Sequence, residues 1–215
     1  MTELTDNFIQ LVIVCICGVC CAVSAVREKN RDWMFLALFY VSFGIGLFYW
    51  ILYMILFSST PRIFCVSELS WTASYVFLII RILSDAETAR DSKAGVFPWC
   101  FPLFSLLMCI IFCQRGSYFE NILMGGTLGM CGYFAARELC FAKKSGARQK
   151  GIFCAAALFF YAAEYLLWIS SYLTADAGVM DPYMIVDTFV LNPALLSMML
   201  AQRVQPADRK SSKAA

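Results

Sequence analysis

The stretch WMFLALFYVSFGIGLFYWILYMILF, residues 33–57, contains no Asp, Glu, Lys or Arg. An α-helix rises about 1.5 Å per residue, so roughly 20 apolar residues cross a hydrocarbon core about 30 Å thick. The stretch exceeds this minimum length. It therefore predicts a helix that spans a membrane.

The composition extends this prediction to the whole chain. Of the 215 residues, 61% are hydrophobic and 15% are charged, whereas soluble domains average about 45–50% and roughly 25%. Such a chain has too few polar residues to cover its apolar surface in water. We therefore expect an all-α, polytopic integral membrane protein surrounded by the lipid bilayer. The formal net charge of +2 is too small to indicate a nucleic-acid partner.

Seven apolar runs are long enough to be spans, and they predict a seven-helix transmembrane domain over residues 1–202 with a short polar, basic tail at 203–215. The runs are Phe8–Val26, Trp33–Phe57, Ile63–Leu83, Phe97–Phe112, Tyr118–Phe141, Gly151–Tyr172 and Tyr183–Ala201. The segment before the first run carries Glu3 and Asp6 and no basic residue. A cleavable signal peptide begins with positive charge, so we read the first run as a span.

The distribution of Lys and Arg predicts the topology. With seven spans, fifteen of the 17 basic residues fall on one side of the membrane and only Arg62 and Arg115 on the other. Basic residues in short connections mark the cytoplasmic side. We therefore predict an outside N-terminus and a cytoplasmic C-terminus, in a cell membrane.

Two related motifs place polar groups inside predicted spans. ELSWTASY (residues 68–75) and EYLLWISSY (residues 164–172) share the pattern Trp-x-x-Ser-Tyr, with a Glu three residues before Trp71 and four before Trp168. Positions i, i+3 and i+7 lie on one face of a helix. Each motif is thus expected to present a carboxylate and two aromatic rings on one side.

Among the carboxylates within the predicted spans, we single out Glu68, Glu164 and Asp187. An ionisable group in a span costs about 2.5–3.5 kcal/mol on insertion scales and is a functional hypothesis by default. Counting residues from the helix ends places the three about 7–8, 12 and 6 Å below the outer surface. Glu68 and Asp187 are shallow enough for the alternative interpretation of a solvated helix end, whereas Glu164 is not.

Inverted repeats would place Trp71 and Trp168 at mirrored depths, but both are expected near the outer face. The similarity of the motifs is therefore either chance or convergence on one outward-facing pocket. A pocket with carboxylates and aromatic walls suits a cation through ion pairing and cation–π contacts; the alternative is that the carboxylates bind protons. The predicted site consists of Glu68, Trp71, Tyr75, Glu164, Trp168, Tyr172 and Asp187.

Asn192 and Pro193 predict a hinge in the last span, because proline frees a backbone carbonyl inside the helix. The leading hypothesis is a sensor or receptor-like module that binds a small ligand, with a protein partner at the basic cytoplasmic face. The alternative is a small secondary transporter that couples to a cation or proton. Transport would need a polar route below the pocket, for which the candidates are Ser105, Thr127, Asn192 and Ser197.

The chain has no histidine, which disfavours an enzyme because His-based acid–base catalysis and His-ligated metal sites are excluded. We predict no catalytic residue, no metal site and no cofactor. Two further contacts are hypotheses from position. Cys65 and Cys113 lie at adjacent outer helix ends, where a disulfide is conceivable, and Arg81 and Asp85 have the i, i+4 spacing of an ion pair.

Overall fold

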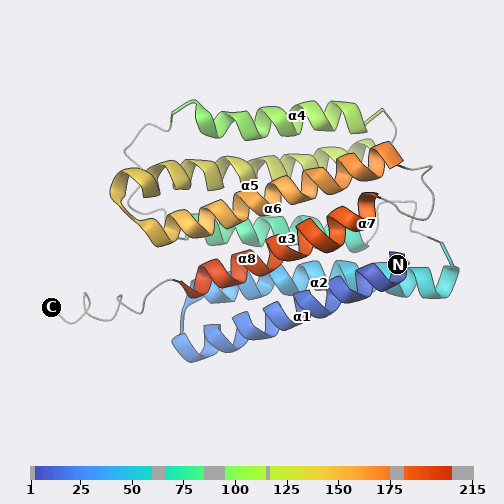
Figure 1. Ribbon diagram of the computed structural model, residues 1–215, viewed down its shortest axis with the longest axis horizontal. Helices are drawn as coiled ribbons and strands as arrows, with labels where there is room; N and C mark the ends of the chain where they lie inside the picture. Colours follow the sequence, from blue (N-terminus) through green and yellow to red (C-terminus); the bar gives the residue numbers. More distant parts are fainter. Residues whose placement is uncertain (1–2, 60–65, 85–94, 115–116, 175–181, 205–215) are drawn as a thin grey trace.

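The computed structural model describes residues 3–59, 66–84, 95–114, 117–174 and 182–204. These residues form an all-helical bundle whose long helices lie side by side along the long axis of the molecule (Figure 1). The elements are α1 (Glu3–Glu28), α2 (Arg31–Phe57), α3 (Val66–Leu83), the 3-10 helix η2 (Phe97–Trp99), α4 (Cys100–Phe112), α5 (Tyr118–Ser145), α6 (Arg148–Thr174), α7 (Pro182–Val186), the π-helical segment η3 (Asp187–Leu191) and α8 (Asn192–Arg203).

Five stretches of helix are long and apolar enough to cross a membrane: α1, α2, α3, α6 and the continuous α7–η3–α8. Outward-facing apolar side chains such as Phe8, Ile16 and Val23 are more than half exposed, as expected for lipid-facing positions. The predicted all-α, multi-span character is therefore confirmed. Phe97–Phe112 is apolar but shorter, and α5 carries charged residues in its last turns. That all seven runs cross the membrane stays a prediction.

The two ends of the bundle differ in charge. Because successive helices run in alternate directions, the first turn of α1, the C-terminal end of α6 and the start of α7 lie at one end, which we call the acidic end (Figure 1). All the Lys and Arg residues among those described lie towards the other end, which we call the basic end. They are Arg27, Lys29, Arg31, Arg81, Arg137, Lys143, Lys144, Arg148, Lys150 and Arg203.

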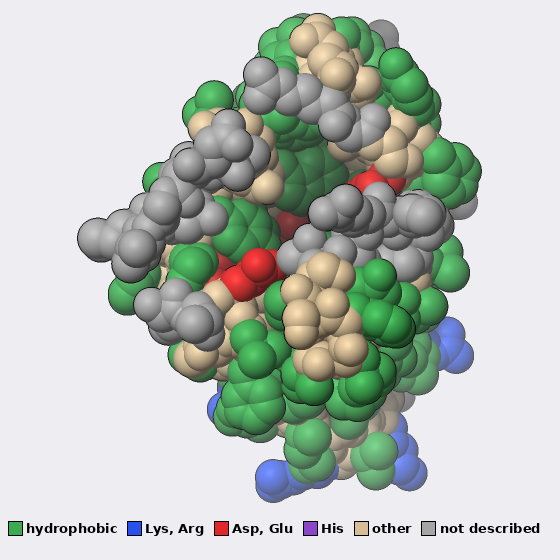
Figure 2. Space-filling model, turned by 90° about the vertical axis from the view of Figure 1, so that its right-hand side faces the viewer, with side chains coloured by type: hydrophobic (Ala, Val, Ile, Leu, Met, Phe, Trp, Pro, Cys, Tyr) green, Lys and Arg blue, Asp and Glu red, His purple; other side chains and the backbone are tan. Residues whose placement is uncertain are grey.

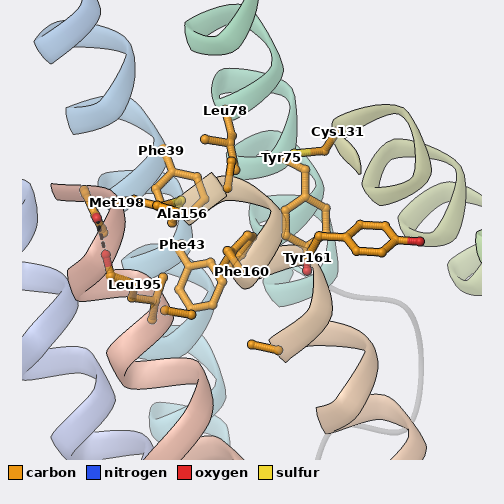
Figure 3. Packing of buried hydrophobic residues seen from close by; sticks show 14 of the residues in the cluster. Phe39, Phe43, Tyr75, Leu78, Cys131, Ala156, Phe160, Tyr161, Leu195 and Met198 are labelled. Atoms are coloured by element: carbon orange, nitrogen blue, oxygen red, sulfur yellow. Dashed lines mark hydrogen bonds between the residues drawn. The ribbon is translucent and has the colours of Figure 1, made fainter. Parts of the chain in front are cut away.

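Phe160 of α6 lies at the centre of the apolar core (Figure 3). Its ring packs edge-on against Phe39 and Phe43 of α2, with centroid separations of 5.4 and 6.2 Å, and against Tyr75 of α3 at 6.0 Å. Tyr40 follows Phe39 in α2, and its hydroxyl donates a hydrogen bond to the Leu195 carbonyl at 2.6 Å. The core thus joins α2, α3, α6 and α8 in the middle of the bundle.

A buried polar cluster joins the same helices at the basic end. Arg81 is only 2% exposed, and its guanidinium donates to Gln202 Oε1 at 2.6 and 2.9 Å and to Ser84 Oγ at 3.2 Å. It also lies 3.7 Å from Asp32 Oδ2 and stacks over the Phe153 ring. A buried charge persists only when it is paired and hydrogen-bonded. These contacts therefore fix α3 to α2, α6 and α8. Asp85, the expected local partner, lies outside the described residues.

Some helix boundaries differ from the predicted runs. The first helix begins at Glu3 rather than Phe8, because the polar residues before Phe8 continue the helix. The last run is interrupted: η3 is π-helical, and the Asn192 N–H bonds to the Asp187 carbonyl. Pro193 follows directly and has no N–H to donate to the carbonyl four residues earlier. The wider turn accommodates this missing donor, since π-bulges insert one extra residue into a helix.

Small residues bring α4 and α5 into close contact. A Cβ added to Gly129 would lie 2.9 Å from the Cβ of Ser105, and one added to Gly125 would lie 3.6 Å from that of Cys109. The Gly-x-x-x-Gly spacing thus faces α4, as such motifs do in membrane helices. Gly126, one position away, has open space around its Cα.

We predict opposite effects for two alanine substitutions in α5. Gly129→Ala lowers the melting temperature in detergent, because the added methyl must displace Ser105. Gly126→Ala leaves the melting temperature unchanged or raises it, since alanine is favoured over glycine in a helix by about 1 kcal/mol. Equal effects of the two substitutions would contradict this packing of α4 on α5.

Candidate functional site

A cavity of about 570 Å³ penetrates the bundle from the acidic end. Its lining comes from α1, α2, α3, α4, α5, α6, α7 and η3. Figure 2 looks at this end and shows acidic side chains in a hollow bordered by hydrophobic and other side chains. The volume lies within the range of about 300–1,000 Å³ that is typical of small-molecule sites.

The cavity brings together residues from both predicted motifs. Six of the seven predicted site residues line it: Trp71, Tyr75, Glu164, Trp168, Tyr172 and Asp187. Glu68 does not belong to the lining. It is buried beside the cavity, where it accepts a 2.8 Å hydrogen bond from Ser67 and lies close enough to interact with Glu120 of the lining. That these residues bind a ligand stays a prediction.

The opposite directions of α3 and α6 explain how two similar motifs form one site. In α3 the tyrosine of the motif is deeper than the tryptophan, whereas in α6 the glutamate is the deepest residue. Tyr75 and Glu164 therefore meet at the bottom of the cavity, where their side chains are hydrogen-bonded. Trp71 and Trp168 lie nearer the opening.

Aromatic rings form much of the wall. Trp71 packs on Trp50 of α2 with centroids 5.7 Å apart, and Phe112 of α4 packs on Trp168 and Tyr172 at 5.9 and 5.5 Å. Glycine makes room for one of these rings, because a Cβ on Gly46 would lie 2.7 Å from Trp71 Nε1. Rings held in this way present fixed faces to the cavity.

Glu164 is the deepest charged group of the cavity. Its side chain is 3% exposed, and its Oε1 has no hydrogen-bond partner. Glu3, Glu120 and Asp187 also line the cavity, and no Lys or Arg among the described residues does. The cavity is therefore rich in acidic groups without a described basic partner in the lining, and one buried carboxyl oxygen lacks a hydrogen-bond donor.

The N-terminal helix contributes a polar face that the motifs do not reveal. Glu3, Asn7 and Gln10 line the cavity, and Gln10 Nε2 donates to Asp187 Oδ1 at 2.5 Å. Asp6 is fully buried and accepts a hydrogen bond from the Thr188 hydroxyl. The i, i+4 and i+7 spacing of Glu3, Asn7 and Gln10 is the sequence signal that would have placed them on one helix face.

The predicted hinge directly follows the part of the last helix that lines the cavity. Asn192 is buried with neither side-chain polar atom hydrogen-bonded, and it follows η3 directly; with Pro193 it stays a predicted hinge. Cys65 lies outside the described residues, so the disulfide with Cys113 also stays a prediction. Within the described ranges, no three His, Cys, Asp or Glu side chains come together as metal ligands.

We predict that Glu164→Gln stabilises the ligand-free protein. The amide keeps the shape of the side chain and an acceptor for Tyr75, while it removes a buried charge with an unpartnered oxygen. Burying an ionised group without a counter-charge costs more than burying a neutral amide, so the melting temperature in detergent should rise. Glu120→Gln is the control, because Glu120 is partly exposed and its replacement should have a smaller effect. A loss of stability in Glu164→Gln would show that the carboxylate is already satisfied.

No protein-family model matches the chain, and comparisons with curated proteins and with solved structures find no similar protein. The function is therefore argued from the cavity and its residues.

Proposed function

We propose that this protein is a seven-span membrane sensor that binds a small organic cation from outside the cell in the cavity at its acidic end. The observation that carries the proposal is Glu164: a buried carboxylate with an unpartnered oxygen at the bottom of an aromatic-walled cavity. A bound ammonium group would supply the missing donors and compensate the charge.

The surrounding groups favour an organic cation. An ammonium near Glu164 would contact the rings of Tyr75 and Trp168, and each cation–π contact is worth about 0.5–2 kcal/mol. The apolar part of the ligand would pack against Phe112 and Trp71. A small protonated amine therefore matches the unpartnered oxygen, the charge and the walls of the cavity, whereas a quaternary ammonium compound matches only the charge and the walls because it has no N–H.

The charge distribution supports an outside N-terminus. The described basic residues lie at the end opposite the cavity, and basic residues favour the cytoplasmic side. In this orientation the cavity opens to the exterior and the basic end carries the surface for a cytoplasmic protein partner. Seven spans also require α4, which is apolar but short, and α5, which is long but carries charged residues in its last turns. The close packing of α4 on α5 is compatible with both helices lying in the membrane.

The last helix offers a physical connection between the cavity and the basic end. Asp187 lines the cavity and begins η3, and α8 continues from it to Gln202. Gln202 is held by Arg81 in the buried polar cluster. A ligand that contacts Asp187 can therefore bias the position of α8, and with it the cytoplasmic surface.

The region below the cavity supports sensing over transport. Of the residues proposed for a polar route, Ser197 and Thr127 donate to carbonyls of their own helices, and Ser105 contacts the Tyr161 hydroxyl at 3.0 Å. Only Asn192 keeps unsatisfied polar atoms. Phe43, which lines the cavity, packs against Phe160 in the buried core (Figure 3), so transport past these rings would require the core to separate.

We predict that reporters fused to the two termini will give opposite signals. A reporter that is active only in the cytoplasm should work after Ala215, and one that is active only outside should work before Met1. The reason is the odd number of spans combined with the basic cytoplasmic side. Active cytoplasmic reporters at both ends would show an even number of spans and overturn the proposed topology.

We predict that a subset of amines raises the melting temperature of the detergent-purified protein, because a ligand that binds only the folded state stabilises it by mass action. The panel contains primary amines, quaternary ammonium compounds, metal cations and neutral analogues. Glu164→Gln should abolish the shift even though it stabilises the free protein. Trp168→Leu should weaken it at least several-fold.

Trp99→Leu is the matched control, since Trp99 is exposed in η2 and does not line the cavity. It should leave the ligand shift unchanged. A shift that survives in Glu164→Gln, or that neutral analogues reproduce, would contradict the proposed site. Proteoliposomes then separate the two functions: a bound amine that also accumulates inside the vesicles would make the protein a transporter.

A further inference from the structure

We propose that Asp6 and Asp187 share a single proton and form a proton-binding site at the wall of the cavity. The site belongs to the contact between α1 and η3. Asp187 lines the cavity, whereas Asp6 does not and is buried beside it.

One buried carboxyl oxygen in this contact lacks a hydrogen-bond donor. Asp6 and Asp187 are 0% and 1% exposed. Gln10 donates to Asp187 Oδ1 at 2.5 Å, and the Thr188 hydroxyl donates to Asp6 Oδ1. The two carboxyl groups are also within hydrogen-bonding reach of each other, and Asp6 Oδ2 has no partner.

An ionised carboxylate only accepts hydrogen bonds, whereas a protonated one also donates. Two ionised carboxylates therefore cannot bond to each other. One proton on the pair converts the contact from a repulsion into an O–H···O hydrogen bond and supplies the donor that Asp6 Oδ2 lacks. Burial strengthens the repulsion between two ionised groups, which favours the singly protonated pair.

The neighbouring titratable groups also favour a proton on the pair. The groups close to the pair are Glu3 on α1, Glu164 on α6 and Tyr183 on α7. None of the three carries positive charge. The described Lys and Arg residues lie towards the basic end. Each of these surroundings opposes two negative charges on Asp6 and Asp187.

The pair occupies a position at which a proton can affect the whole last helix. Asp187 begins η3, where its carbonyl accepts the Asn192 N–H, and Thr188 is bonded to Asp6. Release of the proton would place two like charges at the contact between α1 and η3 and weaken it. Because Asp187 also lines the cavity, a bound cation and the proton would compete. This last consequence rests on the proposed function; the shared proton itself does not.

Infrared spectroscopy of the ligand-free, full-length protein in lipid tests the proposal. The C=O stretching band of a protonated carboxyl group shifts when H2O is replaced by D2O, which identifies it. At neutral pH we expect this band in the wild type, with its loss in Asp6→Asn and in Asp187→Asn and its retention in Glu164→Gln. Absence of the band in the wild type, or its retention in both Asn variants, would overturn the shared proton.

Two other outcomes of the same infrared experiment would identify a different site. A band that is lost only in Glu164→Gln would place the proton on Glu164 and overturn the site. A band that appears only when sodium is removed would make the pair a sodium site instead. The Asn variants are expected to fold, because the amide N–H of Asn can donate to the remaining carboxylate in place of the proton.

Melting temperatures provide a second measurement. The wild type should lose stability as the pH rises enough to remove the shared proton, because the folded protein holds a proton that the unfolded chain releases. Asp187→Asn should lose this dependence. A pH dependence equal to that of the wild type would count against the pair. Neither measurement uses a ligand, so failure of the proton site and failure of the cation panel are distinguishable.

Discussion

The burial of carboxylates at one end of an apolar bundle, away from the described cations, is the constraint on which the rest of the structure depends. Three of the buried acids at this end accept a hydrogen bond from another helix. Tyr75 supplies one to Glu164, Gln10 supplies one to Asp187, and Thr188 supplies one to Asp6. These bonds join α1, α3, α6 and η3 around the cavity. The hydrogen bonds that these acids accept therefore help to shape the cavity. The carboxyl oxygens without a partner are the ones for which the described residues supply no hydrogen-bond donor.

At the basic end, the buried acids are paired with cations from the protein itself. Asp32 accepts from Ser84 at 2.6 Å beside the Arg81 guanidinium, and Glu138 is paired with the Lys150 ammonium at 2.5 Å. Acids at that end therefore have cations within reach. The difference matters because buried charges without a counter-charge are costly in a membrane. The acids at the basic end are paired with cations, whereas Glu164 at the acidic end has no cation beside it among the described residues. Ligand binding can offset the free-energy cost of this unpaired group.

Most of what the sequence could predict came from patterns among residues close together in the chain, namely apolar length and helical spacing. Apolar length identified the helices, and the spacing within ELSWTASY and EYLLWISSY predicted that Trp71 and Trp168 would approach one pocket. Contacts between distant segments carried no such signal. The pair of Arg81 with Asp85, four residues on, stays a prediction because Asp85 lies outside the described residues, but the bond from Arg81 to Gln202 across the bundle could not be predicted from the sequence. Asp6 was read only as part of an acidic leader, because its partner Thr188 lies at the other end of the chain.

The location of η3 bears on the proposed sensor function. Side chains in a close-packed core pass a displacement on to their neighbours, because there is little free volume to absorb it. Below the cavity the rings of Phe39, Phe43 and Phe160 are packed in this way, so a ligand has no open path through them. The regular α-helical pattern of the last helix changes at Asp187, where η3 is π-helical, and Pro193 lacks the N–H that a regular helix would use. If the protein is the proposed sensor, a movement that begins at Asp187 would run along α8 to the Gln202–Arg81 contact at the basic end.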